Sequence, residues 1–278
     1  MTKKIAFQGE LGAYSHQACL QAKPEYQPVS CSTFEEAIEK VKSELVDLAM
    51  LPIENSTYGR VADIHRLLPS SELNIIGEVF VRVKISLLGV KGSKLLDINT
   101  AVSHTVLLGQ CRKFLTKHNI EAISGADTAG SAKHISKLGD ISKAALASEL
   151  AGKIYGLSVL AKDIEDHDNN TTRFLIMSKT PIADALTNTK MMTSFVFRVK
   201  NIPAALFKAM GGFATNGVNM TKLESYMVDG DFTATQFYAE IEGHPNDKFV
   251  SLAFEELAYF TSKITILGSF PADSRRDL

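Results

Sequence analysis

The sequence predicts an α/β protein in two parts, a larger region over residues 1–180 and a smaller βαββαβ domain over residues 193–270. Three observations predict this. Short apolar runs alternate with segments of helical spacing throughout the larger region. A stretch of proline, small and polar residues follows and is expected to be a linker over 181–192. Beyond it, the periodicity indicates strand, helix, strand, strand, helix and strand in that order.

In the larger region the apolar runs predict buried strands, at residues 5–8, 29–31, 48–53, 101–103 and 144–147. The segment Phe34–Leu45 between two of them is amphipathic, and Thr33 and Glu36 have the spacing of a helix capping box. Residues 107, 111, 114 and 115 repeat at helical spacing after a later strand. This alternation predicts α/β units around a mostly parallel sheet.

Two extended stretches suggest that the chain crosses between two lobes. Residues 75–90 are β-like with no helix among them, and residues 157–164 precede a strand at 173–178. We therefore expect lobe A at about 1–78 and 165–180, lobe B at about 79–164, and a cleft between them.

The smaller domain has clearer periodicity. Strands are predicted at residues 193–200, 218–228, 232–242 and 264–270, and helix faces at 206–213 and 249–260. Gly217 is the expected end of the first helix, and Asp229-Gly230-Asp231 is a hairpin signal. The resulting order is that of a ferredoxin-like unit, followed by a tail at 271–278.

Composition excludes several classes of partner. The net charge is −1 without a sustained basic run, which argues against nucleic acid or an anionic membrane. No window approaches the roughly 18 apolar residues that a membrane helix needs. The three cysteines lack any C-x-x-C pair, so neither a disulfide framework nor a zinc site is expected, and a cytoplasmic location fits best.

Polar residues gather where predicted strands end, the edge at which open α/β sheets bind ligands. These positions are Ser15, Glu54, Asn55, Ser56, Ser103, Gln110, Asp127, Thr128, Thr172 and Arg173. Ordinary helix caps and βα turns are the alternative for several of them. The acidic run 166–168 could hold a hard metal ion, although a solvated loop is the more common case. The residues alone indicate a two-lobed binder of a small anion, whether or not it is an enzyme.

Six segments in this order closely resemble the prephenate dehydratase family. They are FQGELGAYSH, LPIENSTYGRV, SHTVLLGQCRKFL, DTAGSA, AALASELAGKIYGL and IEDHDNNTTRFLIM. The resemblance spans residues 5–178, and residues 193–270 resemble the ACT regulatory domain that usually follows. It implies a catalytic region with the two-lobed fold of periplasmic binding proteins. Because the first strand opens the chain, we expect a monofunctional enzyme without a preceding chorismate mutase.

The resemblance implies loss of CO2 and hydroxide from prephenate, giving phenylpyruvate on the route to phenylalanine, without metal or organic cofactor. The family pattern assigns catalytic roles to Thr172 at the leaving hydroxyl, to Arg173 and Phe174 beside it, and to Glu54 and Asn55. It assigns substrate contacts to Ser15, Ser56, Ser103, Gln110, Asp127 and Thr128. The alternatives are an arogenate dehydratase and a non-catalytic metabolite sensor.

In the ACT-like region the family binds phenylalanine between paired domains, so an L-phenylalanine effector and a homodimer or homotetramer are implied. The implied pocket residues are Ala204, Ala205, Leu206, Asn219, Leu223, Glu224 and Ser225. Three positions in this region depart from the family. Ala204 stands where glycine is usual, and Tyr226 and Met227 stand where an arginine and a proline are usual.

Overall fold

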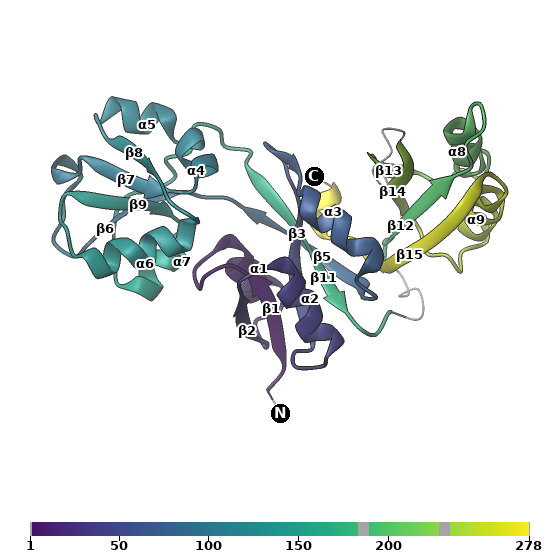
Figure 1. The fold of residues 1–278 in the computed structure, drawn as a ribbon, viewed down its shortest axis with the longest axis horizontal. Coiled ribbons are helices and arrows are strands. Elements are labelled where there is room, and N and C mark those ends of the chain that lie inside the picture. The colour runs from purple at the N-terminus through teal and green to yellow at the C-terminus, as the bar shows by residue number, and fades with distance from the viewer. Residues whose placement is uncertain (1, 183–188, 228–233, 278) are drawn as a thin grey trace. The chain divides into compact units, whose positions relative to one another are not determined.

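The computed structural model describes residues 2–182, 189–227 and 234–277. The predicted linker therefore lies partly, and the predicted hairpin at 229–231 wholly, outside the described residues. The chain divides into two compact units, one of residues 1–40, 50–61 and 79–174 and one of residues 41–49, 62–78 and 175–278. The described strands form three sheets (Figure 1).

The first sheet has the strand order β2-β1-β3-β11-β5, with the short β4 paired to β3. Its strands are β1 Lys4–Gln8, β2 Gln27–Cys31, β3 Leu48–Asn55, β4 Gly59–Arg60, β5 Asn74–Arg82 and β11 Thr171–Ser178. The associated helices are α1 Tyr14–Ala22, α2 Phe34–Lys42, α3 Ala62–Leu67 and the 3-10 turn η1 Leu68–Ser70. β1 and β2 are parallel, and the almost continuous burial of β3 is that of a central strand.

Helix α2 begins at the predicted cap. The amide of Glu36 donates to Thr33 Oγ1 over 3.1 Å, and the Glu36 carboxylate accepts from the Ser32 amide over 2.6 Å. Both bonds satisfy amide groups near the start of the helix. The helix ends at Lys42, three residues before the predicted Leu45.

The second sheet has the strand order β10-β6-β9-β7-β8. Its strands are β6 Ser86–Gly89, β7 Thr100–Ser103, β8 Glu121–Ser124, β9 Lys143–Ala147 and β10 Ser158–Ala161. β7 runs parallel to β8 and β9, but β6 is antiparallel to both of its neighbours. β6 follows β5 without a crossover helix, and such a helix is the usual route to a parallel neighbour. The expectation of a mostly parallel sheet is therefore wrong at β6.

Helices cover both faces of the second sheet (Figure 1). They are α4 Thr105–Gln110, α5 Arg112–Lys117, α6 Thr128–Leu138 and α7 Glu149–Tyr155, with the 3-10 turn η2 Leu95–Asp97 before β7. Alternate residues of β9 belong to two separate cores. Ala144 and Leu146 pack with α4 and α5, whereas Ala145 and Ala147 pack with α6 and α7. All four are fully buried, as the period-two geometry of a strand between two helix layers requires.

Two segments connect the first and second sheets, residues 83–85 and 162–170, and they are hydrogen-bonded to each other. The Val83 amide donates to the Asn170 carbonyl over 2.9 Å, and the Ile164 amide donates to the Ile85 carbonyl over 3.0 Å. The Glu165 carboxylate accepts from the Ile85 amide over 3.0 Å. The ends of β5, β6 and β11 are thereby held close to one another.

The third sheet confirms the predicted βαββαβ order. Its elements are β12 Met191–Val199, α8 Ala205–Thr215, β13 Met220–Met227, β14 Ala234–Glu242, α9 Lys248–Phe260 and β15 Thr261–Pro271. The strand order β13-β14-β12-β15 is antiparallel throughout, as in a ferredoxin-like sheet. Rings of Phe195, Phe213 and Phe254 pack together in its core, 4.9–5.7 Å apart. The 3-10 turn η3 Ser274–Asp277 follows β15.

Candidate functional site

A cavity of about 240 Å3 lies where elements of the first and second sheets meet. It is lined by Gln8, Gly9, Ala13, Tyr14, Ser15, Pro52, His104, Asp127, Thr128, Thr172 and Phe174. Five of these residues were predicted as site residues from the sequence, namely Ser15, Asp127, Thr128, Thr172 and Phe174. The other six belong to the same motifs. Most of them have no acidic, basic or nucleophilic side chain, so a search of the sequence for catalytic groups does not select them.

The Thr172 hydroxyl accepts a hydrogen bond from a side chain, Asn55, whose own orientation is fixed. The Asn55 carbonyl Oδ1 accepts from two backbone amides, those of Thr57 over 2.9 Å and Tyr58 over 3.0 Å. The Asn55 amide Nδ2 must therefore point the other way. It donates to Thr172 Oγ1 over 2.9 Å and to Asn170 Oδ1 over 2.7 Å. Because Thr172 Oγ1 accepts that bond, its own proton can be donated into the cavity.

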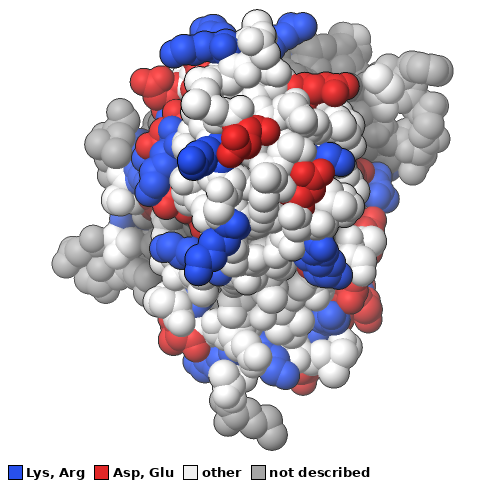
Figure 2. Space-filling model, turned by 90° about the vertical axis from the view of Figure 1, so that its left-hand side faces the viewer, with Lys and Arg blue, Asp and Glu red and all other residues white. Residues whose placement is uncertain are grey.

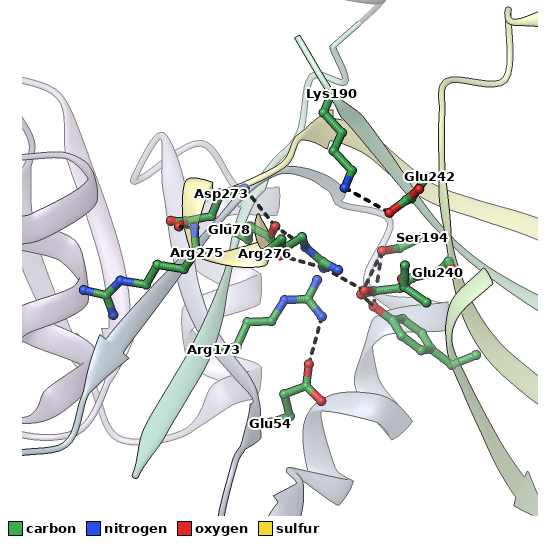
Figure 3. A network of polar contacts seen from close by, with 12 residues as sticks. Glu54, Glu78, Arg173, Lys190, Ser194, Glu240, Glu242, Asp273, Arg275 and Arg276 are labelled. Carbon is green, nitrogen blue, oxygen red and sulfur yellow. Dashed lines mark hydrogen bonds and ion pairs between the residues drawn. The ribbon is translucent and has the colours of Figure 1, made fainter. Parts of the chain in front are cut away.

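Glu54 and Arg173 form an ion pair behind the cavity and do not line it. Arg173 Nη1 lies 2.9 Å from Glu54 Oε1, and the Arg173 side chain is 3% exposed (Figure 3). The guanidinium also lies 5.9 Å from the centre of the Phe80 ring. The Glu54 side chain is 28% exposed, so the pair is buried mainly on its arginine side. In this structure Arg173 joins β11 to β3.

The loop before α1 is shaped by Gly12, which has φ +94°, a conformation that favours glycine. A Cβ at this position would lie 2.6 Å from the Cα of Ala151 in α7. The Ser148 hydroxyl donates to the Gly12 carbonyl over 2.6 Å, and the Gly12 amide donates to His16 Nδ1 over 3.0 Å. The loop thus packs directly on α7 at one side of the cavity.

Three helices, α1, α4 and α6, begin at or just after residues that line the cavity, and α4 is capped by its own His104. α1 has neither a side-chain cap nor an acidic residue in its first turn, so its terminal amide groups remain available to an anion. α6 is capped by Asp127, whose Oδ1 accepts from the Gly130 amide over 2.6 Å. The α6 terminus is therefore partly neutralised, and α1 offers the stronger positive end.

Three further predicted substrate contacts lie away from this cavity. Ser56 binds the loop before β11, accepting from the Thr171 amide over 2.9 Å and donating to the Asn169 carbonyl over 2.7 Å. Ser103 is fully buried and donates to the Leu146 carbonyl over 2.7 Å. Gln110 is 8% exposed and lines a second, much smaller cavity.

Burial shifts the pKa of Tyr14 and of His16 beside this loop. It raises the pKa of Tyr14 well above its usual range, with smaller contributions from Cys111 and Glu165, so this phenol stays protonated. The Tyr14 hydroxyl donates to the Lys84 carbonyl over 2.8 Å. Burial lowers the pKa of His16, whose ring stacks on Phe7 at 5.3 Å. His16 is therefore neutral at pH 7 and accepts at Nδ1.

Charges of both signs are interspersed on the face of the molecule that Figure 2 presents, in keeping with the net charge of −1. Within residues 2–182, 189–227 and 234–277, no three His, Cys, Asp or Glu side chains are grouped to hold a metal ion. In the same ranges no helix is long and apolar enough to cross a membrane. Cys19, Cys31 and Cys111 are free thiols and buried.

Comparison with known proteins gives consistent matches. The sequence profile of the prephenate dehydratase family matches residues 5–182. A bifunctional N-acyl-homoserine lactone acylase/prephenate dehydratase of Komagataeibacter europaeus is 45% identical over 98% of this chain and 97% of its own. Arogenate dehydratase/prephenate dehydratase 2 of Arabidopsis thaliana is 39% identical over 98% of this chain and 73% of its own. The crystal structure of prephenate dehydratase with L-Phe from Arthrobacter aurescens has a TM-score of 0.87 at 28% identity, covering 97% of this chain and 90% of its own.

Proposed function

Because this chain belongs to the prephenate dehydratase family, we propose that it converts prephenate to phenylpyruvate, with loss of CO2 and water. The electron pair of the breaking carbon–carboxylate bond enters the ring as the ring hydroxyl departs as hydroxide, which takes up a proton from solvent to give water. Aromatisation of the ring supplies the driving force. The enzyme must bind two carboxylates and stabilise the departing oxygen.

The observation that carries this proposal is the directed hydroxyl of Thr172 at the cavity wall. Asn55 donates to Thr172 Oγ1, so the threonine proton points away from Asn55 and can be donated to a ligand in the cavity that Thr172 lines. A hydroxyl is a weak acid, so its role is to hydrogen-bond the departing oxygen as negative charge develops. One such preorganised donor is worth roughly 10²–10³ in rate.

The two carboxylates of prephenate require positive or donating groups. The open N-terminus of α1, beside Ser15, supplies one such site, and the hydroxyl of Thr128 supplies a further donor. Glu54, Asn55 and Arg173 then act from behind the cavity, holding β3 and β11 in place. Phe174 provides an apolar wall for the ring.

The direct test is to follow phenylpyruvate absorbance on incubation of the purified protein with prephenate. Thr172→Val keeps the shape of the side chain but removes the proton, so we expect kcat to fall at least about tenfold. Thr171→Val, the neighbouring threonine, is the matched control and should stay within about twofold of wild type. No turnover by the wild-type protein would overturn the assignment. Wild-type turnover by Thr172→Val would exclude the role given to its hydroxyl.

Arogenate, which carries an amino group in place of the keto group, is a second candidate substrate. The name of the Arabidopsis relative includes both activities. The Asp127 carboxylate at the cavity wall is the feature of this site that would favour an ammonium group. Measuring kcat/KM for both substrates under the same conditions separates the two, and Asp127→Asn should lower only the value for arogenate.

A second candidate activity is hydrolysis of the amide bond of N-acylated homoserine lactones, which the name of the Komagataeibacter relative includes. A cavity of about 460 Å3 between α6 and strands β7 and β8 favours it, because Val102, Ile123, Ile135 and Leu138 give it apolar walls suited to an acyl chain. This cavity shares Asp127 with the polar one. Release of free homoserine lactone from substrates of graded chain length is the measurement, and no release at any length would exclude the activity.

We further propose that L-phenylalanine regulates the enzyme by binding between the C-terminal units of paired copies, in a cytoplasmic homodimer or homotetramer. The related Arthrobacter structure contains L-Phe. In this chain Asn219, Leu223 and Ser225 are exposed on or beside the edge strand β13, and Ala204 is exposed at the start of α8. Large apolar side chains are also exposed on this unit and would gain from pairing, namely Phe207, Met227, Phe249 and Tyr259.

A further inference from the structure

A second cavity lies against the segment that returns from the second sheet to the first. It is lined by Thr57, Gln110, Glu165, His167 and Asn170, and its volume of about 10 Å3 is close to the smallest that holds one water molecule. It is distinct in its lining from the cavity that Thr172 borders.

Two buried amide side chains at this cavity have polar atoms to satisfy. Gln110 is 8% exposed and Asn170 is 2% exposed. In the part of the chain that the structure describes, neither Gln110 Oε1 nor Asn170 Nδ2 has a hydrogen-bond partner in the protein. A buried polar atom without a partner is costly, so such atoms are normally paired with protein or with ordered water.

The orientation of Asn170 follows from a line of amides that starts at the backbone. The amides of Thr57 and Tyr58 fix Asn55 Oδ1, which turns Asn55 Nδ2 toward both Asn170 Oδ1 and Thr172 Oγ1. Asn170 must then keep its oxygen toward Asn55 and its Nδ2 away from it. One donor, Asn170 Nδ2, and one acceptor, Gln110 Oε1, are thus left at residues that line the same small cavity.

We propose that this cavity holds one water molecule, which accepts from Asn170 Nδ2 and donates to Gln110 Oε1. Gln110 is then a positioning residue. Through the water it restrains Asn170, and Asn170 adds to the hold of the Thr57 and Tyr58 amides on Asn55, which donates to the Thr172 hydroxyl. This role rests on the proposed dehydratase function, and it replaces the direct substrate contact that the sequence suggested for Gln110.

The arrangement favours water over a cation. Glu165 and the Gln110 carbonyl would suit a monovalent cation, but the Asn170 donor at the same cavity would oppose one. The Glu165 carboxylate is also engaged already, since it accepts from the Ile85 amide and lies 3.6 Å from Arg82. Only a group that both donates and accepts satisfies the two amides together.

Steady-state kinetics of Gln110→Met tests the role of the glutamine. This change keeps the length of the side chain but removes the acceptor, so kcat should fall about tenfold while KM stays within about twofold. In a Thr172→Val background the same change should alter kcat less than twofold, because the hydroxyl that it positions is absent. Gln110→Glu retains an acceptor oxygen and should stay within about threefold of wild type. The matched control is Gln21→Met, an exposed glutamine on α1.

Several results would overturn the proposal. A raised KM with unchanged kcat would make Gln110 a substrate contact. A full tenfold loss of kcat on adding Gln110→Met to Thr172→Val would also contradict it. So would equal losses of kcat in Gln110→Met and Gln110→Glu. A crystal structure of the wild-type protein with an empty cavity, or with the two amides in direct contact, would do so even if the variants fail to fold. By contrast, a wild-type protein inactive on both prephenate and arogenate would overturn the proposed function itself.

Discussion

Ala204 carries a methyl group in a backbone conformation that favours glycine. Its φ of 59° and ψ of 26° lie in the left-handed region, immediately before α8. For an L-residue this region costs roughly 1 kcal/mol or more. The family resemblance places glycine at the same position, so this chain tolerates local strain where a phenylalanine effector is proposed to bind.

We expect Ala204→Gly to raise the free energy of unfolding by about 0.5–1 kcal/mol, since relief of strain exceeds the added flexibility of the unfolded chain. Ala214→Gly, an exposed position in the last turn of the same helix, should instead lower it by about 0.5–1 kcal/mol. Urea unfolding of both variants measures the difference. A lower free energy of unfolding for both glycine variants would show that Ala204 is not strained.

At the residue scale, sequence reasoning selected segments that meet at the polar cavity, but not the depth of each side chain. Thr172, Thr128 and Ser15 line the cavity, whereas Arg173 and Ser103 are buried and do not line it. Alternation along a strand gives two faces, but it does not tell which face meets the ligand when both are buried. The partner of Arg173 could not be deduced either, because Glu54 is 119 positions away in the sequence and no local pattern links the two residues.

At the scale of elements, α1 depends on a neutral histidine. His16 Nδ1 accepts the amide of Gly12, and this bond helps to shape the loop along the cavity. Burial lowers the pKa of His16 below the usual 6.5, so protons bind the unfolded chain more readily than the folded one. The stability contributed by neutral His16 is therefore present above about pH 6.5 and is lost as the pH falls through the lowered pKa.

His16→Asn keeps an acceptor near the Gly12 amide but does not titrate. We expect the free energy of unfolding of this variant to fall less between pH 7.5 and pH 5.5 than that of the wild-type protein. Urea unfolding at several pH values gives both slopes. Equal slopes would mean that His16 is not the source of the acid sensitivity.

Elements with strong periodicity were predicted well, and those set by tertiary context were not. The βαββαβ order and the strands around Ile5, Leu48 and Ala144 follow directly from apolar patterns. The edge strand β8 has four exposed residues and therefore gives no apolar signal. The stretch 75–90 divides into β5 and β6 because the backbone at 83–85 pairs with the returning segment, a partner that no local pattern reveals.

At the scale of the molecule, the C-terminal turn is held by buried charges. Arg276 lies 2.6 Å from Glu78 Oε1 on β5 and 2.9 Å from Glu240 Oε2 on β14 (Figure 3). Both carboxylate side chains are at most 1% exposed. Tyr238 and Ser194 also donate to Glu240. The last residues of the chain therefore help to neutralise carboxylates that two separate sheets bury.

Arg276→Met should lower the free energy of unfolding by about 3–5 kcal/mol, because it removes a cation from two buried carboxylates. The exposed neighbour provides the control, and Arg275→Met should change the value by less than about 0.5 kcal/mol. Adding Glu78→Gln to Arg276→Met should recover part of the loss. Urea unfolding measures all three, and equal effects of the two arginine variants would contradict the role of the ion network.

The paired connections between the first two sheets limit how the catalytic region can move. Residues 83–85 and 162–170 are bonded side by side through backbone amides, the Glu165 carboxylate and the Lys84–Asp163 ion pair at 3.1 Å. Two connecting segments that are hydrogen-bonded to each other can bend together as one hinge, but they resist rotation of one sheet against the other. We therefore expect ligand entry and release to involve a single hinge motion. Thr172 and Asn55 lie near this hinge, and the N-terminus of α6 moves with the second sheet.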